Sequence, residues 1–150
     1  MQPIEIGHAV GRAHRVTYVG ELGWELYIPA DMSAHVFETL MVRRKDHDLA
    51  LCGLHALDSC RIEKAFRHFG HDISNEDHVL EAGLGFAVKE DKMAGRFGGM
   101  IGADAVRAKR NDGLSQRLMQ FCLKDREPLL YHNEAILRDG ELIGYLTSGN

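Results

Sequence analysis

Paired cysteines, an excess of basic residues and long apolar runs are all missing from this chain. Its three cysteines, Cys52, Cys60 and Cys122, are widely spaced and form no CxxC pair. This pattern argues against a disulfide framework and against a thiolate metal site, and we expect all three to be buried small hydrophobic residues. The formal net charge is −4, with Lys and Arg scattered rather than massed. The chain therefore has no electrostatic footprint for nucleic acid.

No apolar run is long enough to span a bilayer, and no charged-then-apolar leader opens the chain. We therefore expect no membrane partner and a cytoplasmic location, or the mitochondrial matrix in a eukaryote. A length of 150 residues fits one domain, or one domain plus a fragment. Residues 1–13 lack the start signals of a complete domain, so we expect the chain to begin within a fold.

Familiar signatures of metal and nucleotide sites are also missing. Nine histidines include His68, His71 and His78 near two aspartates, but no HExxH or similar ligand spacing accompanies them. The glycines at 83 and 85 do not fit GxGxxG, and the glycine-rich run at 95–102 lacks the Lys-Ser/Thr of a phosphate loop. A bound metal or dinucleotide is therefore not favoured.

The most informative stretch runs from Thr17 to Tyr27 and is rich in β-formers interrupted by two glycines. It predicts a strand–turn–strand with arms over 15–19 and 24–28. Strand alternation places Glu25 and Tyr27 on one face and the intervening apolar residues on the other. A carboxylate beside an aromatic ring suits a flat heterocycle with paired N–H donors, such as guanine, pterin or folate. The alternative is a solvent-facing glutamate on an ordinary hairpin.

Helical spacing of apolar residues and flanking turn signals predict the other elements. We expect helices over 31–45, 53–66 and 103–110, and a glycine turn feeding a buried strand over 79–88. Beyond Gly113 we expect strands over 118–123, 135–137 and 142–145, the last two joined by Asp139-Gly140. These strands are the start of an all-β unit but are too few to close a barrel. We therefore expect the C-terminus to be cut within this unit.

Four blocks together resemble the folate-dependent aminomethyltransferase family. They are YVGELGWEL at 18–26, GLHALDSCRIEKAFRHFGHDI at 53–73, LEAGLGFAVK at 80–89 and GYLTSG at 144–149. The family includes the aminomethyltransferase of the glycine cleavage system and the C-terminal folate domains of dimethylglycine and sarcosine dehydrogenases. The RIEK…GHDI block is more similar to the dehydrogenase branch.

This resemblance implies an α+β fold in which helices pack on a sheet, followed by a truncated antiparallel β-barrel domain. Residues 1–95 would be the later half of the folate-binding domain, 96–113 a linker with a short helix, and 114–150 the first barrel strands. The implied function is a fragment of an enzyme that passes a one-carbon unit from an amine derived from glycine, dimethylglycine or sarcosine to tetrahydrofolate. The dehydrogenase members suggest FAD in an attached domain.

The resemblance also implies site residues. The pterin edge would be held by Glu25, and the ring of Tyr18 would lie near the folate. The glycine-cleavage members of the family have an arginine at the position of Leu57, so Arg61 is the remaining candidate for an anion, or else for a structural pair with Glu21 or Glu63.

No catalytic residue is expected within the chain, because the family's acidic residue should lie upstream of Met1. We therefore expect the piece to be inactive alone and to self-associate through exposed apolar surface. The alternatives are a non-catalytic folate-binding protein and a structural module of a larger flavoprotein.

Overall fold

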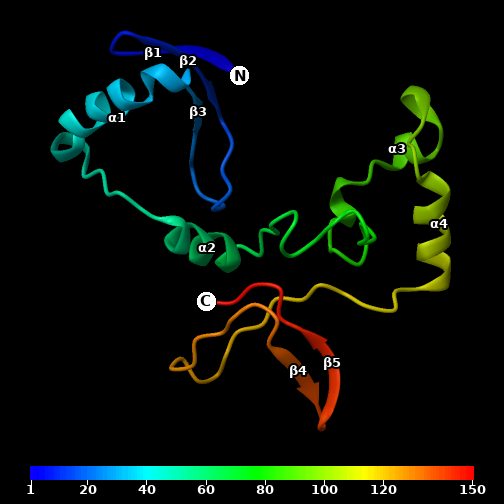
Figure 1. Cartoon of the computed structure of the whole chain (residues 1–150). Coiled ribbons are helices and arrows are strands. Elements are labelled where there is room, and N and C mark those ends of the chain that lie inside the picture. The colour runs from blue at the N-terminus through cyan, green and yellow to red at the C-terminus, as the bar shows by residue number, and fades with distance from the viewer. The chain divides into compact units, whose positions relative to one another are not determined.

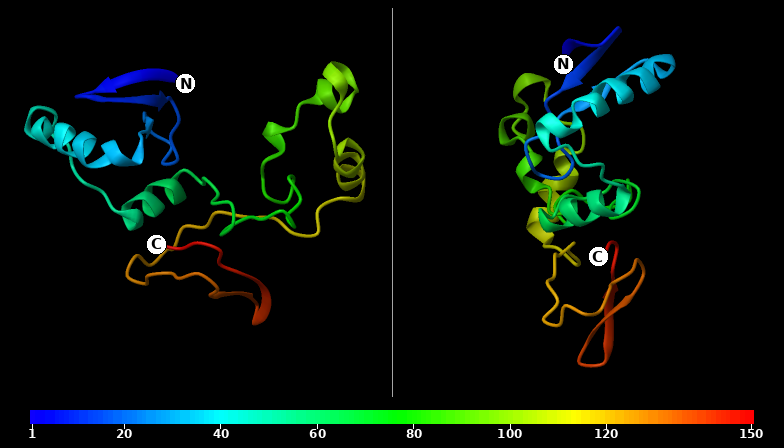
Figure 2. Two further views of the ribbon diagram at one scale, coloured as in Figure 1. Left: turned by 45° about the horizontal axis from the view of Figure 1, so that its top comes forward. Right: turned by 90° about the vertical axis from the view of Figure 1, so that its left-hand side faces the viewer.

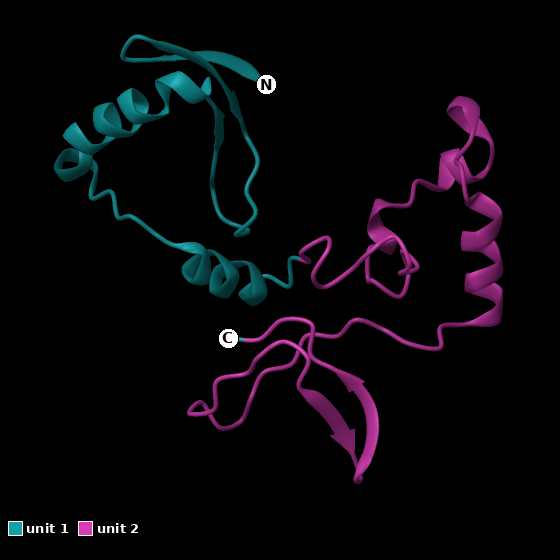
Figure 3. Ribbon diagram, viewed as in Figure 1, with its two compact units in different colours: residues 1–66, 150 teal, residues 67–149 magenta.

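The computed structural model describes all residues 1–150 and divides them into two units (Figure 3). Unit 1 comprises residues 1–66 together with Asn150, and unit 2 comprises residues 67–149. Each unit is described by itself. None of the helices combines the length and the apolar character that crossing a bilayer requires.

Unit 1 contains a three-stranded antiparallel sheet in the order β1-β2-β3 (Figure 1). Its strands are β1 (Gln2–Ile6), β2 (Ala9–His14) and β3 (Glu25–Tyr27). Small residues line the buried side of β2, where Ala9, Gly11 and Ala13 alternate with exposed neighbours. An added Cβ at Gly11 would lie 2.8 Å from the Tyr27 carbonyl oxygen. The small residues thus allow the close approach of β3.

The predicted pairing in this sheet was wrong. Residues 15–19 form no strand, and the partner of β3 is β2. The segment 1–13, for which the sequence predicted no strand, supplies most of the β1–β2 hairpin. The buried residues of β2 are alanine and glycine, whose weak apolar character hides the strand alternation in the sequence.

Helices follow the sheet in unit 1. They are η1 (Ala30–Met32), α1 (Ser33–Val42), η2 (Arg44–His47) and α2 (Leu54–Glu63). The helices predicted over 31–45 and 53–66 are confirmed. Helix α1 buries Val36, and the backbone N–H of His8 donates to Nε2 of His35 at 2.9 Å. This bond joins α1 to the β1–β2 turn.

The turn at residues 20–23 is held against the end of α2 (Figure 1). Gly20 has φ +77°, and a Cβ there would lie 2.5 Å from Cγ of Lys64. The Lys64 ammonium lies 3.0 Å from the Glu21 carboxylate, which raises the pKa of Lys64. Glycine is therefore required at position 20 by both its backbone conformation and its neighbour.

Unit 2 has four short helical segments and one hairpin (Figure 2). They are η3 (Gly85–Ala87), α3 (Glu90–Met93), η4 (Arg96–Gly98), α4 (Ala103–Asp112), β4 (Ala135–Arg138) and β5 (Glu141–Tyr145). The turn residues Asp139 and Gly140 have φ values of 53° and 84°, as a type I′ hairpin turn requires. The predicted hairpin and the helix at α4 are confirmed.

Two strands predicted in unit 2 were wrong. Residues 79–88 form turns and η3, and residues 118–123 are irregular. The backbone N–H of Leu118 donates to the carbonyl oxygen of Glu81 at 2.8 Å, but residues 118–123 join neither sheet. A run of apolar residues suits a strand only where a partner strand pairs with it. The barrel that these strands would begin stays a prediction.

The Glu81 side chain contacts both α4 and the segment that follows it. Its carboxylate lies 2.7 Å from Nζ of Lys109 and accepts a hydrogen bond from Oγ of Ser115 at 3.2 Å. Glu81 is only 7% exposed. Mainly because Lys109 donates to it, the pKa of Glu81 lies below its ordinary range.

We expect the contribution of Glu81 to stability to depend on pH. Because its pKa is lower in the folded than in the unfolded state, this contribution is complete above the unfolded pKa and is lost as pH falls through the folded pKa. In urea titrations, Glu81→Gln should therefore be less stable than the wild type near pH 7 and close to it at an acidic pH below the folded pKa of Glu81. The control is Glu127→Gln, on an exposed loop. A stability difference between Glu81→Gln and the wild type that is equal at both pH values would contradict the role of the ionised carboxylate.

The three cysteines are all exposed, so their predicted burial was wrong. The apolar residues beside Cys52 are exposed as well, with Leu51 at 60% and Leu54 at 79%. The segment around α2 therefore offers this thiol no apolar interior.

Large apolar side chains are widely exposed in both units. Phe86 and Phe97 are 80% and 81% exposed, and no large side chain is fully buried. We expect the chain to enhance the fluorescence of anilinonaphthalene sulfonate and to self-associate, measured by sedimentation across a concentration series. A compact monomer that does not enhance the fluorescence of the dye would contradict this expectation.

Candidate functional site

The exposed face of β3 carries the predicted acceptor and its aromatic neighbour. Glu25 and Tyr27 lie two residues apart on one strand and share a face, as alternation predicted. The hydroxyl of Tyr27 donates a hydrogen bond to Oε2 of Glu25 at 2.9 Å. The predicted association of this carboxylate with an aromatic residue is confirmed.

The electrostatics of this pair keep the phenol protonated. The hydrogen bond to Glu25, and then its negative charge, raise the pKa of Tyr27 above its ordinary value. The second oxygen of Glu25, Oε1, makes no hydrogen bond in the protein. The pair therefore presents an accessible carboxylate oxygen beside an aromatic ring.

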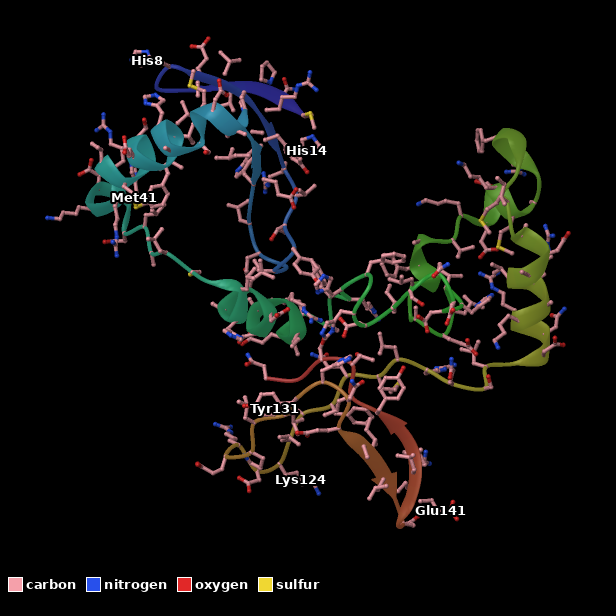
Figure 4. All side chains as sticks on the ribbon, viewed as in Figure 1. His8, His14, Met41, Lys124, Tyr131 and Glu141 are labelled. Atoms are coloured by element: carbon pink, nitrogen blue, oxygen red, sulfur yellow. The ribbon has the colours of Figure 1, made fainter.

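His14 is a third member of this cluster and was not predicted from the sequence. It lies at the end of β2, where Figure 4 labels it, and is opposite Glu25 in the β2–β3 register. Its ring centroid is 5.0 Å from that of Tyr27, with the planes inclined at 53°. Its Nε2 is buried and has no hydrogen-bond partner in the protein. The register of β2 and β3, which the sequence did not reveal, is the signal that identifies His14.

The opposite side of this stretch carries Trp24. The Arg15 guanidinium carbon lies 5.4 Å from the centroid of the Trp24 ring, a cation–π arrangement. Trp24 is 56% exposed. The two sides of β3 therefore differ in chemistry, and the acceptor group lies on the side with Tyr27.

The other two predicted site residues lie elsewhere in unit 1. Tyr18 is half-buried in the irregular segment between β2 and β3. Arg61 is buried at the end of α2, where it donates from Nε to Asp58 at 3.0 Å and from an Nη to the Phe66 carbonyl at 3.2 Å. These contacts support a structural role for Arg61, with Asp58 as a partner that the sequence did not indicate.

Unit 2 brings together two of the sequence blocks noted above. The Asp72 side chain, 4% exposed, accepts hydrogen bonds from the backbone N–H of His68, from Thr147 Oγ1 and from Ser148 Oγ at 2.8, 2.7 and 2.5 Å. Thr147 follows Asp72 by 75 residues. Asp72 thus connects residues 70–73 (the GHDI block) to residues 147–149 (the TSG block).

Three histidine rings surround this connection. The ring of His71 stacks on that of His68 with centroids 5.6 Å apart, and lies 4.5 Å from that of His132. Oγ of Ser148 lies 3.2 Å from Nδ1 of His71. No group of three His, Cys, Asp or Glu side chains is arranged to hold a metal ion. The cluster is best described as a hydrogen-bonded junction.

Comparisons with known proteins agree with the sequence blocks. Residues 1–92 match the family model described as the GCVT N-terminal domain. The chain is 40% identical over 147 residues to 4-methylaminobutanoate oxidase (formaldehyde-forming) of Paenarthrobacter nicotinovorans, which covers 98% of this chain and 17% of that protein.

Two further relatives are named as a dehydrogenase and as an aminomethyltransferase. Human mitochondrial sarcosine dehydrogenase is 39% identical over 140 residues, covering 93% of this chain and 15% of that protein. The aminomethyltransferase of Halothermothrix orenii is 40% identical over 136 residues, covering 91% and 36%. The chain thus spans well under half the length of these relatives. Because the family model covers more than half of this chain, the protein belongs to the folate-dependent aminomethyltransferase family.

Proposed function

We propose that this chain is part of a tetrahydrofolate-dependent enzyme that passes a one-carbon unit from an amine to tetrahydrofolate. The amine would be derived from glycine, dimethylglycine or sarcosine. The observation that carries the proposal is the exposed Glu25 carboxylate beside Tyr27, within the part of the chain that the family model matches.

The chemistry of this face fits a pterin. A carboxylate has about four lone-pair sites, and Tyr27 uses one of them on Oε2. The remaining sites on Glu25 can accept two adjacent N–H donors from a flat ring. Tyr18 is proposed to lie near the folate by the family resemblance. Arg61 is the weakest member of the proposed set, because its guanidinium already has protein partners.

When bound, the folate supplies the nitrogen that accepts the one-carbon unit. The proposed role of Glu25 is to bind and orient the ring, so that the reacting groups are held close together. Proton transfer needs a further acidic group. We propose that this group lies outside residues 1–150, so the chain alone would be inactive.

A second candidate is a non-catalytic folate-binding or structural module of a larger flavoprotein. It is favoured by the relatives named as an oxidase and as a dehydrogenase, of which the chain covers 17% and 15%. FAD would then belong to an attached domain, because these residues carry no dinucleotide fingerprint. We propose a cytoplasmic location, or the mitochondrial matrix in a eukaryote.

Calorimetric titration with 5-formyltetrahydrofolate tests binding, and a separate assay with tetrahydrofolate and the amine tests one-carbon transfer. Both should be applied to this chain and to a version extended upstream to include the acidic group. Binding by either, followed by one-carbon transfer only in the extended version, would support the enzyme. Binding without transfer in both would favour the non-catalytic module. Absence of binding in both would contradict a folate site.

A further inference from the structure

We infer that Tyr27 is a positioning residue that fixes the Glu25 carboxylate for the ligand. The inference rests on the proposed function, because it concerns the same site. It adds a residue that the predicted set of Glu25, Tyr18 and Arg61 does not contain. The direct contact is the 2.9 Å hydrogen bond from the Tyr27 hydroxyl to Oε2 of Glu25.

An exposed glutamate needs such a partner if it is to bind a ring in one orientation. Its flexible side chain samples several rotamers in water, and ordering it on binding costs free energy. A hydrogen bond to a rigid phenol restricts the carboxylate before the ligand arrives. Tyr27 therefore lowers the ordering cost that binding would otherwise include.

Tyr27 is itself held in place from two directions. Its backbone lies opposite Arg12 in the β2–β3 ladder. Its ring lies beside that of His14, with centroids 5.0 Å apart. His14 is half-buried, whereas all three residues of β3 are exposed. The His14 ring of β2 thus lies beside the Tyr27 ring, and the Tyr27 hydroxyl in turn donates to the Glu25 carboxylate.

The direction of the hydrogen bond also selects the ligand. The phenol is the donor, so Glu25 stays an acceptor, and the hydrogen bond uses Oε2 rather than Oε1. Ligands that present N–H groups should bind there, whereas a carbonyl at the same position would face the carboxylate with like polarity. The raised pKa of Tyr27 agrees with a phenol that stays protonated through neutral pH.

A double-mutant cycle distinguishes positioning from a general structural role. Affinity for 5-formyltetrahydrofolate is measured in the version of the chain that binds it, for the wild type, Tyr27→Phe, Glu25→Ala and the double variant. We expect Tyr27→Phe to weaken binding about tenfold in the wild-type background and to have no further effect once Glu25 is alanine. Tyr145→Phe, at an exposed tyrosine of β5, is the matched control and should bind as the wild type does.

The outcomes separate the two proposals. If the wild type does not bind, or if Glu25→Ala binds as tightly as the wild type, the folate site itself is wrong. If Glu25→Ala weakens binding but Tyr27→Phe does not, only the positioning role is overturned. Equal weakening by Tyr27→Phe in both backgrounds would likewise overturn it, since the tyrosine would then act independently of Glu25.

Discussion

Replacing Glu25 with alanine should weaken binding of 5-formyltetrahydrofolate about a hundredfold, because hydrogen bonds to a charged acceptor contribute about 1.5–3 kcal/mol. The free energy of unfolding should change by less than about 0.5 kcal/mol, as is usual for exposed side chains. Glu25 is exposed on β3, and its one protein partner is the equally exposed Tyr27. Calorimetry gives the affinity, and urea titration gives the stability.

Two further variants test whether the expected loss of affinity is specific to the Glu25 carboxylate. Glu38→Ala removes an exposed glutamate from α1 and should leave affinity unchanged. Glu25→Gln keeps one oxygen acceptor but loses the charge, so its affinity should fall between those of the wild type and Glu25→Ala. A parallel loss of stability and affinity in Glu25→Ala would show that the residue supports the fold rather than the ligand.

Asp72→Ala should be the most damaging single substitution in unit 2. It removes a carboxylate whose side chain is 4% exposed and which accepts hydrogen bonds from the hydroxyls of both Thr147 and Ser148. Hydrogen bonds to charged groups contribute about 1.5–3 kcal/mol, so we expect a loss of about 3 kcal/mol for the junction. Hydrogen exchange of the amides in residues 144–149 measures this loss locally.

The controls for this substitution are in the same unit. Ser148→Ala removes one donor and should cost less than Asp72→Ala. Asp125→Ala removes an exposed aspartate whose bond to the backbone of Glu127 is local, and should leave exchange at residues 144–149 unchanged. Unchanged exchange in Asp72→Ala would mean that the junction is not what holds the TSG block.

Local chemistry made part of this fold predictable. The helices α1, α2 and α4 follow from the spacing of apolar residues and from their flanking turn signals. The β4–β5 hairpin follows from Asp139-Gly140, because few residue pairs tolerate two successive positive φ angles. The shared face of Glu25 and Tyr27 follows from the period of a strand, whichever strand it pairs with. The four blocks also predicted the family that the comparisons show.

Long-range contacts decided the rest. The pairing of β3 with β2 brings His14 to the candidate site, and the sequence pattern specifies this register only weakly because the buried side of β2 carries only alanine and glycine. The junction of Asp72 with Thr147 spans 75 residues and has no local signature. Residues 118–123 have the composition of a strand but belong to neither sheet. The sequence by itself determined the helices, the hairpin turn and the acceptor face, because each depends on neighbours along the chain. Only the tertiary structure decided which residues support that face, because support comes from segments that meet through folding.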